Sequence, residues 1–492
     1  MKLSNDLFEL VSSMSKSEKR YFIMSSKLQS GSKIYVSLFK ALEKQSEYDE
    51  KKFKSRYKNE KFINNYAFNK KNLYDLLMKA LTAYGYSSTV DGKLHAMIAE
   101  CRILFNKALY KKYFRAIAKA KQFAYKHERY GYLLQILDME KIIIPKEIIH
   151  KQKSEEIMNE VKTAAKKIIE VFEYSNIAGT LLNNYRHYGL TRGSEHTALL
   201  DSLSTGGIMS SPGKPRSKRA LEAYYRVKEI SSGIKADSEE TYKALLNRYR
   251  VVINDPYPFK NYLLHYPADI MFSLAECCIN LNRTDEAENY LKEIENILLN
   301  DKYNLEDYEI YKGYLNFRIF LKKGDIQKAS KLIPSLENIL VIYKDKLQID
   351  TELSILYHVL VCRVEEKNYL KALDACNRLM SHPLLAKRAD YETYSRILNL
   401  VIHFELKNYE LLKYLLVRTY RYLCKHEKLF KTEQLIIDFI LKLQKVKTDD
   451  DLNFNFSKLE TKLSRLKKDK YEKNAFEYFD LHKWVESKLK QG

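Results

Sequence analysis

Glycine and proline are scarce in this chain. Only 14 Gly and 8 Pro occur among 492 residues, whereas average usage of the two together is roughly 12%. Tight turns need glycine for a positive φ and proline for a fixed φ, so a chain with few of them builds few turns. The shortage disfavours hairpin-rich sheets, collagen-like repeats and Pro/Gly-rich disorder. Since a hydrophobic content of 45% is enough for a large core, the composition predicts an all-α protein.

Cysteine pairs and long apolar runs are lacking too. The 6 cysteines show no C-x-x-C spacing, which disfavours a disulfide framework or a zinc knuckle and favours reduced thiols. No run approaches the roughly 18 apolar residues of a membrane-spanning helix. Residues 1–10 carry Asp6 and Glu9 and have no apolar core of the kind found in secretory signals. We therefore expect a cytoplasmic protein with no membrane partner.

Signatures of common enzymes are also missing. No G-x-G, G-x-S-x-G or H-E-x-x-H pattern occurs, which removes the usual evidence for dinucleotide-binding enzymes, α/β hydrolases and zincins. The stretch from Gly207 to Lys214 approaches a phosphate-binding loop, but Pro215 stands where Ser or Thr would bind magnesium. We expect no catalytic residues, no cofactor and a non-enzymatic function.

One acidic stretch approaches a calcium-binding EF-hand loop. Its liganding positions hold oxygen-bearing side chains, namely Asp449, Asp451, Asn453, Asn455 and Glu460. Phe454, however, stands where the loop needs glycine, and a left-handed conformation costs a non-glycine residue roughly 1–2 kcal/mol. We predict no metal site here and interpret the stretch as a polar turn before a helix that begins near Ser457.

The excess of positive charge is concentrated in one half of the chain. Residues 1–260 hold 47 Lys and Arg against 28 Asp and Glu, whereas residues 261–492 hold 38 against 35. Such an asymmetry indicates a polyanionic partner, of which nucleic acid is one candidate. The alternative is compositional, because Lys outnumbers Arg by 64 to 21, as an AT-rich genome would encode, and arginine is the residue preferred for bidentate phosphate binding.

Two short basic stretches form the candidate polyanion surface. Their side chains are Lys16, Lys19, Arg20, Lys51, Lys52, Lys54, Arg56 and Lys58. Together they are able to line a phosphate-binding surface. The alternative is an ordinary solvated charged face.

Helical periodicity runs through nearly the whole chain. Ser15-x-x-Glu18 is a capping box that predicts the start of a helix, and Asp49 is a cap for a short basic one. Composition and periodicity divide the chain into five segments. These are a basic four-helix head (1–88), helical hairpins (89–188), a Gly/Ser/Pro-rich loop or linker (189–219), helical repeats (220–448) and C-terminal capping helices (449–492).

An internal repeat defines the fourth segment. Four similar stretches are anchored at Ala287, Ala329, Ala372 and Leu412, and each anchor stands between two apolar helical stretches. A small anchor lets the second helix of a hairpin approach the first closely. These hairpins resemble tetratricopeptide repeats, although their period of 40–43 residues is longer than the usual 34. The resemblance implies an α-solenoid of stacked helical hairpins.

A candidate partner groove follows from the tetratricopeptide register. That register places one set of mostly aromatic residues on the inner face of successive first helices, namely Phe272, Tyr311, Tyr314, Arg318, Tyr357, Tyr394 and Ile397. Aromatic side chains with polar tips suit half-buried peptide grooves. The alternative is that these positions form the core between hairpins.

The expected function is a protein-interaction scaffold or regulator that binds a peptide or protein on its concave face. Nucleic-acid or ribonucleoprotein association through the basic half is the alternative. The stretch from Met14 to Phe22 also resembles the opening of an uncharacterised helical-repeat family of Bacteroidota, which implies no activity. The only tryptophan, Trp484, belongs either to a helix that caps the last repeat or to an exposed anchor for a partner.

Overall fold

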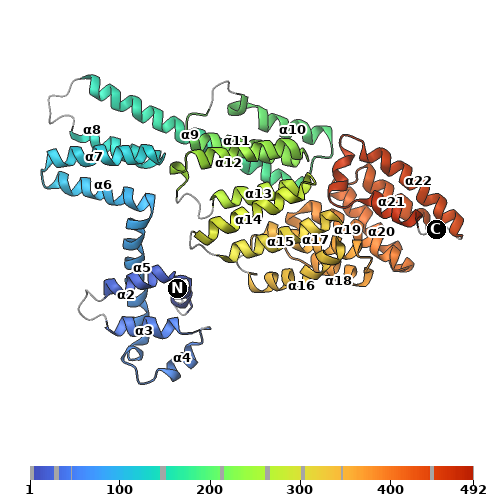
Figure 1. The fold of residues 1–492 in the computed structure, drawn as a ribbon, viewed down its shortest axis with the longest axis horizontal. Helices are drawn as coiled ribbons and strands as arrows, with labels where there is room; N and C mark the ends of the chain where they lie inside the picture. Colours follow the sequence, from blue (N-terminus) through green and yellow to red (C-terminus); the bar gives the residue numbers. More distant parts are fainter. Residues whose placement is uncertain are drawn as a thin grey trace. The chain divides into compact units, whose positions relative to one another are not determined.

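The computed structural model describes residues 5–26, 33–45, 47–143, 151–210, 215–260, 266–300, 305–344, 347–443 and 448–490. Every regular element in these ranges is a helix (Figure 1), which confirms the all-α prediction. The chain forms two compact units, unit 1 (1–165) and unit 2 (166–492). Among the described helices, none is both long enough and apolar enough to cross a membrane.

Unit 1 begins with five short to medium helices, one more than predicted for residues 1–88 in the part that the structure describes. They are α1 (Asp6–Ser13), α2 (Lys16–Ser26), α3 (Lys33–Glu43), α4 (Glu50–Arg56) and α5 (Tyr66–Ser88). The predicted capping box is present, because Ser15 N donates to Glu18 Oε2 (2.7 Å) and Glu18 N donates to Ser15 Oγ (3.3 Å). Asp49 caps α4 as expected, accepting from Lys51 N and Lys52 N.

Antiparallel hairpins follow the head. Helices α6 (Val90–Asn106), α7 (Tyr110–Lys126) and α8 (Tyr130–Ile143) pack consecutively, and α5 packs against α6. The long helix α9 (Lys151–Tyr188) carries the chain from unit 1 into unit 2. The sequence-predicted hairpins at 89–188 are therefore helices α6 to α9.

Unit 2 is a stack of helices in which neighbours along the chain pack together, as in an α-solenoid. After the end of α9 and α10 (Ser194–Thr205), its helices are α11 (Lys218–Ile234), α12 (Ser238–Asn254), α13 (Tyr266–Asn280), α14 (Thr284–Asn300), α15 (Leu305–Lys323), α16 (Ile326–Ile342), α17 (Ile349–Glu365), α18 (Tyr369–Met380), α19 (Ala389–Glu405), α20 (Tyr409–Lys425), α21 (Lys431–Leu443), α22 (Asp449–Lys467) and α23 (Leu481–Leu489).

The turns between consecutive helices repeat one geometry. In seven of them a residue with positive φ stands five positions before a residue that is at most 2% exposed. The pairs are Ala108/Tyr113, Glu128/Leu133, Asn282/Ala287, Gly324/Ala329, Lys367/Ala372, Lys407/Leu412 and Glu427/Thr432. The four anchors predicted from the repeat are thus buried at the start of the second helix. The left-handed residue closes the first helix, and the buried anchor fixes the second against it.

The predicted loop at 189–219 is wrong over most of its length. Residues Ser194–Thr205 form α10, and Gly207–Ser210 form a 3₁₀ turn; residues 211–214 lie outside the described ranges. Thr191 and Arg192 are buried. Glycine and serine in this segment therefore mark helix ends and close packing more than a linker.

The C-terminal segment differs from the prediction in one place. Helix α22 starts at Asp449, with Thr448 Oγ1 accepting from Asp451 N (3.2 Å), so it begins before the expected Ser457 and makes the EF-hand-like stretch helical. Trp484 is buried, and its indole Nε1 donates to Glu405 Oε1 at the end of α19 (2.8 Å). This burial confirms the capping-helix interpretation and excludes the exposed anchor.

The crossing of α5 and α6 depends on a glycine. A Cβ added to Gly92 would lie 2.6 Å from the Cα atom of Tyr86, whereas a Cβ added to Gly85 would meet nothing within 4 Å. We expect Gly92→Ala to destabilise this crossing by about 1–3 kcal/mol through overpacking. Gly85→Ala, in the helix that Gly92 contacts, should instead stabilise α5 by up to about 1 kcal/mol.

Hydrogen–deuterium exchange of α5 and α6 in the full chain measures both effects. Faster exchange is expected in Gly92→Ala and unchanged or slower exchange in Gly85→Ala. Equal protection in the two variants would contradict the close approach.

Candidate functional site

The first helices of successive hairpins in unit 2 form one layer. Helices α13, α15, α17, α19 and α21 contact one another in turn, and the predicted groove residues all come from this layer. One side of this layer faces the end of α9 and the 3₁₀ turn η6 (Glu472–Glu477). We call this side the inner face. The sequence register therefore brings the predicted residues to one layer of the stack.

Most of these residues are not open to a partner. Tyr314, Tyr357, Tyr394 and Ile397 are buried, with at most 5% of their surface exposed, whereas Phe272, Tyr311 and Arg318 are half-buried. The prediction that these four residues line an open groove was therefore wrong. The alternative interpretation, core positions between hairpins, describes them better.

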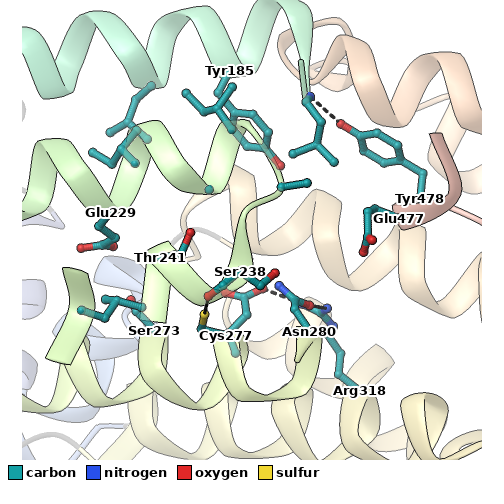
Figure 2. Close-up of a pocket in the computed structure, with 18 of the residues that line it drawn as sticks. Tyr185, Glu229, Ser238, Thr241, Ser273, Cys277, Asn280, Arg318, Glu477 and Tyr478 are labelled. Carbon is teal, nitrogen blue, oxygen red and sulfur yellow. Dashed lines mark hydrogen bonds and ion pairs between the residues drawn. The ribbon is translucent and has the colours of Figure 1, made fainter. Parts of the chain in front are cut away.

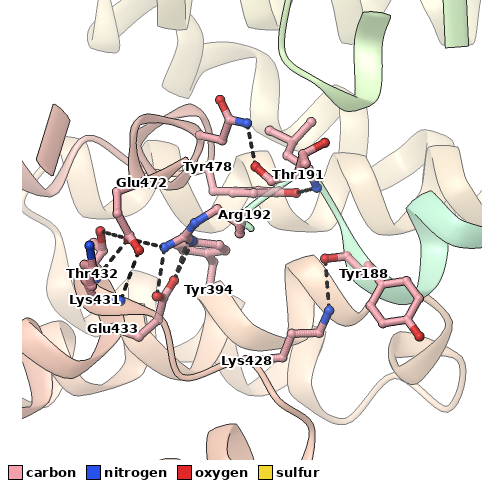
Figure 3. A network of polar contacts seen from close by, with 12 residues as sticks. Tyr188, Thr191, Arg192, Tyr394, Lys428, Lys431, Thr432, Glu433, Glu472 and Tyr478 are labelled. Carbon is pink, nitrogen blue, oxygen red and sulfur yellow. Dashed lines mark hydrogen bonds and ion pairs between the residues drawn. The ribbon is translucent and has the colours of Figure 1, made fainter. Parts of the chain in front are cut away.

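An extended segment of the chain itself covers part of the inner face (Figure 3). It begins at Gly189, which turns the chain at the end of α9 with a φ of 74°, and it runs to Gly193. Leu190 N donates to Tyr478 Oη (2.9 Å), and Asn474 Nδ2 donates to Thr191 O (2.7 Å). We call residues 189–193 the strap. Its main chain is held by side chains of η6 and of the residue that follows η6.

Arg192 anchors the strap. Its guanidinium donates to Glu433 (2.8 and 3.0 Å), to Glu472 (2.6 Å) and to Tyr394 Oη (2.6 Å), and it lies 4.7 Å from the centre of the Phe430 ring. The side chains of Arg192, Glu433 and Glu472 are only 6%, 1% and 5% exposed. The inner face thus binds a guanidinium with two carboxylates and aromatic neighbours.

Electrostatics keep this buried arginine charged. Burial alone would lower the pKa of Arg192, but Tyr394, Glu433 and Glu472 raise it above its usual value. Glu472 has further donors, because it accepts from Thr432 N (3.1 Å) and Thr432 Oγ1 (2.7 Å). The charges are therefore paired and hydrogen-bonded, which is the condition for burying them.

An open cavity of about 410 Å³ lies on the same inner face (Figure 2). Residues of α9, α11, α12, α13, α15, α17 and α19 contribute to its walls, together with the end of η6. Its polar and aromatic lining residues are Tyr185, Glu229, Ser238, Thr241, Ser273, Glu276, Cys277, Asn280, Arg318, Tyr357, His358, Tyr391, Glu477 and Tyr478. We call it the inner cavity. Arg318 and Tyr357 are the predicted groove residues that line it.

Carboxylates outnumber cations among the residues that line the inner cavity. Glu229 pairs with Arg248 (2.8 Å), and Glu276 pairs with Arg318 (2.5 Å). Glu477 is exposed and pairs with no described residue. Burial raises the pKa of Glu229, although Arg248 opposes the shift.

His358 supplies a neutral acceptor to the cavity. Its Nδ1 lies 2.7 Å from Ser354 O and 3.0 Å from Tyr314 Oη. Burial, assisted by Arg318, lowers the pKa of His358 to about 3, so the ring is neutral at pH 7. Because a carbonyl oxygen can only accept, Nδ1 carries the proton, and the lone pair lies on Nε2.

The cavity shows none of the usual arrangements for covalent or metal chemistry. Burial raises the pKa of Cys277 to about 12, so its thiol stays protonated at neutral pH. Within the described ranges, no group of three or more His, Cys, Asp and Glu is placed to hold a metal ion. The arrangement is suited to binding by hydrogen bonds, charge and aromatic contact.

The predicted polyanion surface of unit 1 is partly neutralised. Lys19 pairs with Glu43 (3.4 Å), Lys52 with Asp49 (3.9 Å) and Lys54 with Glu50 (2.8 Å). The remaining predicted residues are exposed: Lys16, Arg20, Lys51, Arg56 and Lys58. Ion pairing therefore leaves five of the eight predicted cations without a carboxylate partner among the described residues.

Sequence reasoning missed two groups of residues. The first is the buried network of Arg192, Glu433 and Glu472, whose members are far apart in the sequence and carry no local signal. The second is an exposed basic stripe on α7, made of Lys111, Lys112, Arg115 and Lys119. This stripe was detectable, because positions 112, 115 and 119 follow helical spacing.

The buried network gives a stability prediction for the strap. Arg192→Ala leaves Glu433 and Glu472 buried without their cation, which should cost about 3–5 kcal/mol. Arg186→Ala is the matched control, because its ion pair with Asp350 is exposed and should contribute about 0–1 kcal/mol.

Urea unfolding followed by the fluorescence of Trp484, the single tryptophan, measures both variants in unit 2. Equal unfolding midpoints for the two variants would show that the network does not hold the strap in place.

No family model, no curated protein and no solved structure matches this chain. The resemblances to tetratricopeptide repeats and to a helical-repeat family of Bacteroidota therefore stay predictions from the sequence. The helix packing and the repeated turns described above stand on the structure alone.

Proposed function

We propose that unit 2 is a tetratricopeptide-like interaction scaffold whose inner face binds an extended segment of a partner protein. One observation carries this proposal: the inner face already holds an extended segment, the strap, by its main chain and by one side chain. Tyr478 accepts from the strap, Asn474 donates to it, and Arg192 anchors it. Main-chain hydrogen bonds combined with side-chain anchors are a general way of recognising an extended peptide.

The inner cavity is the part of this face that the strap leaves open. Its mouth carries exposed polar groups, Glu276, Asn280 and Glu477, and its volume of about 410 Å³ lies within the range of roughly 300–1,000 Å³ typical of ligand sites. Cys277 is held protonated and His358 neutral. These properties favour a binding function over a catalytic one.

Filling the cavity tests this proposal. We expect a display selection of random dodecapeptides on the full chain to enrich peptides that bind wild type and bind Ser273→Trp at least about tenfold more weakly, a difference of ~1.4 kcal/mol. Ser273 lines the cavity and is half-buried on α13, so a tryptophan there occupies the open space.

Lys292→Trp, an exposed position on α14, is the matched control and should leave binding unchanged. Enriched peptides that bind wild type and Ser273→Trp equally would place their site elsewhere. A selection without enrichment would contradict the scaffold function.

We propose a second function for unit 1, nucleic-acid binding, which is supported by an exposed basic stripe on α7. Residues 1–165 hold 32 Lys and Arg against 18 Asp and Glu. On α7, Lys111, Lys112, Arg115 and Lys119 are exposed on consecutive turns. A basic stripe of this kind neutralises successive phosphates and releases their counterions.

Charge reversal tests the stripe. The triple variant Lys112→Glu, Arg115→Glu and Lys119→Glu should bind a fluorescein-labelled DNA duplex or RNA more weakly. Its slope of log affinity against log salt should fall by about 1 for each phosphate that the variant no longer neutralises. The control reverses three exposed lysines of unit 2, Lys331, Lys371 and Lys462, and changes the net charge by the same amount.

Equal losses of nucleic-acid affinity in the two triple variants would indicate that binding depends only on the net charge of the protein. Absence of binding by wild type at low salt would contradict this second function.

A further inference from the structure

Arginine side chains are held in a recurring way on the inner face. Arg192 lies against Phe430 and between two glutamates. Arg388, at the start of α19, lies 3.8 Å from the centre of the Tyr391 ring and donates to Asp390 Oδ2 at 2.8 Å. In both cases a carboxylate neutralises the guanidinium and an aromatic ring packs on it, the pairing to which a planar cation is suited.

The inner cavity offers the same chemistry, and part of its carboxylate surface is not used by the chain itself. Three carboxylates line it, Glu229, Glu276 and Glu477, against one arginine, Arg318. Of these carboxylates, Glu477 is exposed and pairs with no described residue. Glu276 binds Arg318 through Oε1 only, which leaves its second oxygen to accept another donor.

The other lining residues also suit a ligand that donates hydrogen bonds or carries a positive charge. His358 presents the lone pair of Nε2, because its Nδ1 proton points to Ser354 O. Rings of Tyr357 and Tyr478 line the space, together with Tyr185, whose ring already lies 5.1 Å from the guanidinium of Arg388. All these groups accept hydrogen bonds or attract cations.

The residues that line the cavity are unfavourable for an anionic ligand. Among the described residues that line the cavity, Arg318 is the only arginine or lysine, and its two Nη atoms already donate to Glu276 Oε1 and Asn280 Oδ1 (2.5 and 2.9 Å). A carboxylate or phosphate would have to replace these partners while lying near three glutamates. The charge distribution therefore selects against it.

We infer that the inner cavity takes the guanidinium of an arginine in the partner's extended segment, between Glu477 and the unused oxygen of Glu276 on one side and the tyrosine rings on the other. This inference rests on the peptide-binding function proposed above. The strap supplies the precedent within the same molecule, because Arg192 is an arginine of an extended segment held on this face. Glu477, exposed at the cavity, would attract the cation before it enters.

Replacing arginine by citrulline tests the inference, since citrulline keeps the shape of the side chain and removes its charge. In titration calorimetry on the full chain, each enriched peptide should contain an arginine whose replacement weakens binding at least about tenfold. Glu477→Gln should weaken binding of the arginine peptide and leave binding of the citrulline peptide unchanged. The difference in affinity between the two peptides should therefore become smaller. The matched control is Glu293→Gln, at an exposed position on α14. It should leave the difference in affinity between the two peptides unchanged.

Each other outcome is decisive. Peptides that occupy the cavity without an arginine, or that bind equally well as citrulline forms, would overturn the guanidinium assignment while the scaffold function stands. If no peptide is enriched, the scaffold function fails, and N-acetyl-arginine amide then tests the cavity by itself.

At about 50 mM, N-acetyl-arginine amide should raise the Tm of wild type by mass action and not that of Ser273→Trp. N-acetyl-citrulline amide should have no such effect. A Tm shift for the arginine compound alone would support the cavity assignment with a free cation as ligand. Equal or absent shifts for the two compounds would overturn it.

Discussion

The buried ion pair between Arg192 and its two glutamates is the constraint on which the inner face of unit 2 depends. It joins residues that are 241 and 280 positions apart in the chain. Charges this deeply buried are tolerated only when every partner is in place. The strap, the start of α21 and the turn η6 must therefore come together in one geometry, whereas apolar contacts alone would tolerate several.

The strap, held in this position, limits which part of the inner face stays accessible. Where the strap lies, the hydrogen-bonding groups of Tyr394, Tyr478 and Asn474 are already used by the chain itself. The inner cavity stays open, and Glu477 there pairs with no described residue. Under the proposed scaffold function, a partner would therefore meet a short, chemically defined stretch of the inner face and not its whole length.

Local and distant features differ in how far the sequence predicts them. The hairpins, the capping box at Ser15 and the buried anchors such as Ala329 and Ala372 depend on residues within one or two helices, so periodicity and spacing were sufficient to find them. The exposure of Tyr357 and Tyr394 depends on what covers them. The strap and η6 come from distant parts of the chain, and no spacing within a repeat indicates their position. Candidate groove residues were thus assigned to the right layer but with the wrong accessibility.

Gly189 shows why the Gly-rich segment was mistaken for a linker. Its φ of 74° lies in the left-handed region, and a Cβ there would lie 2.8 Å from both Tyr478 Oη and Asp390 Cβ. Glycine is needed at this point because the chain must leave α9 sharply and pass close to α19. Composition reveals that glycines gather in a segment, but the same composition serves a mobile linker and a tightly packed one. Only the neighbours of Gly189 and Arg192, which are brought there by the rest of the solenoid, distinguish the two.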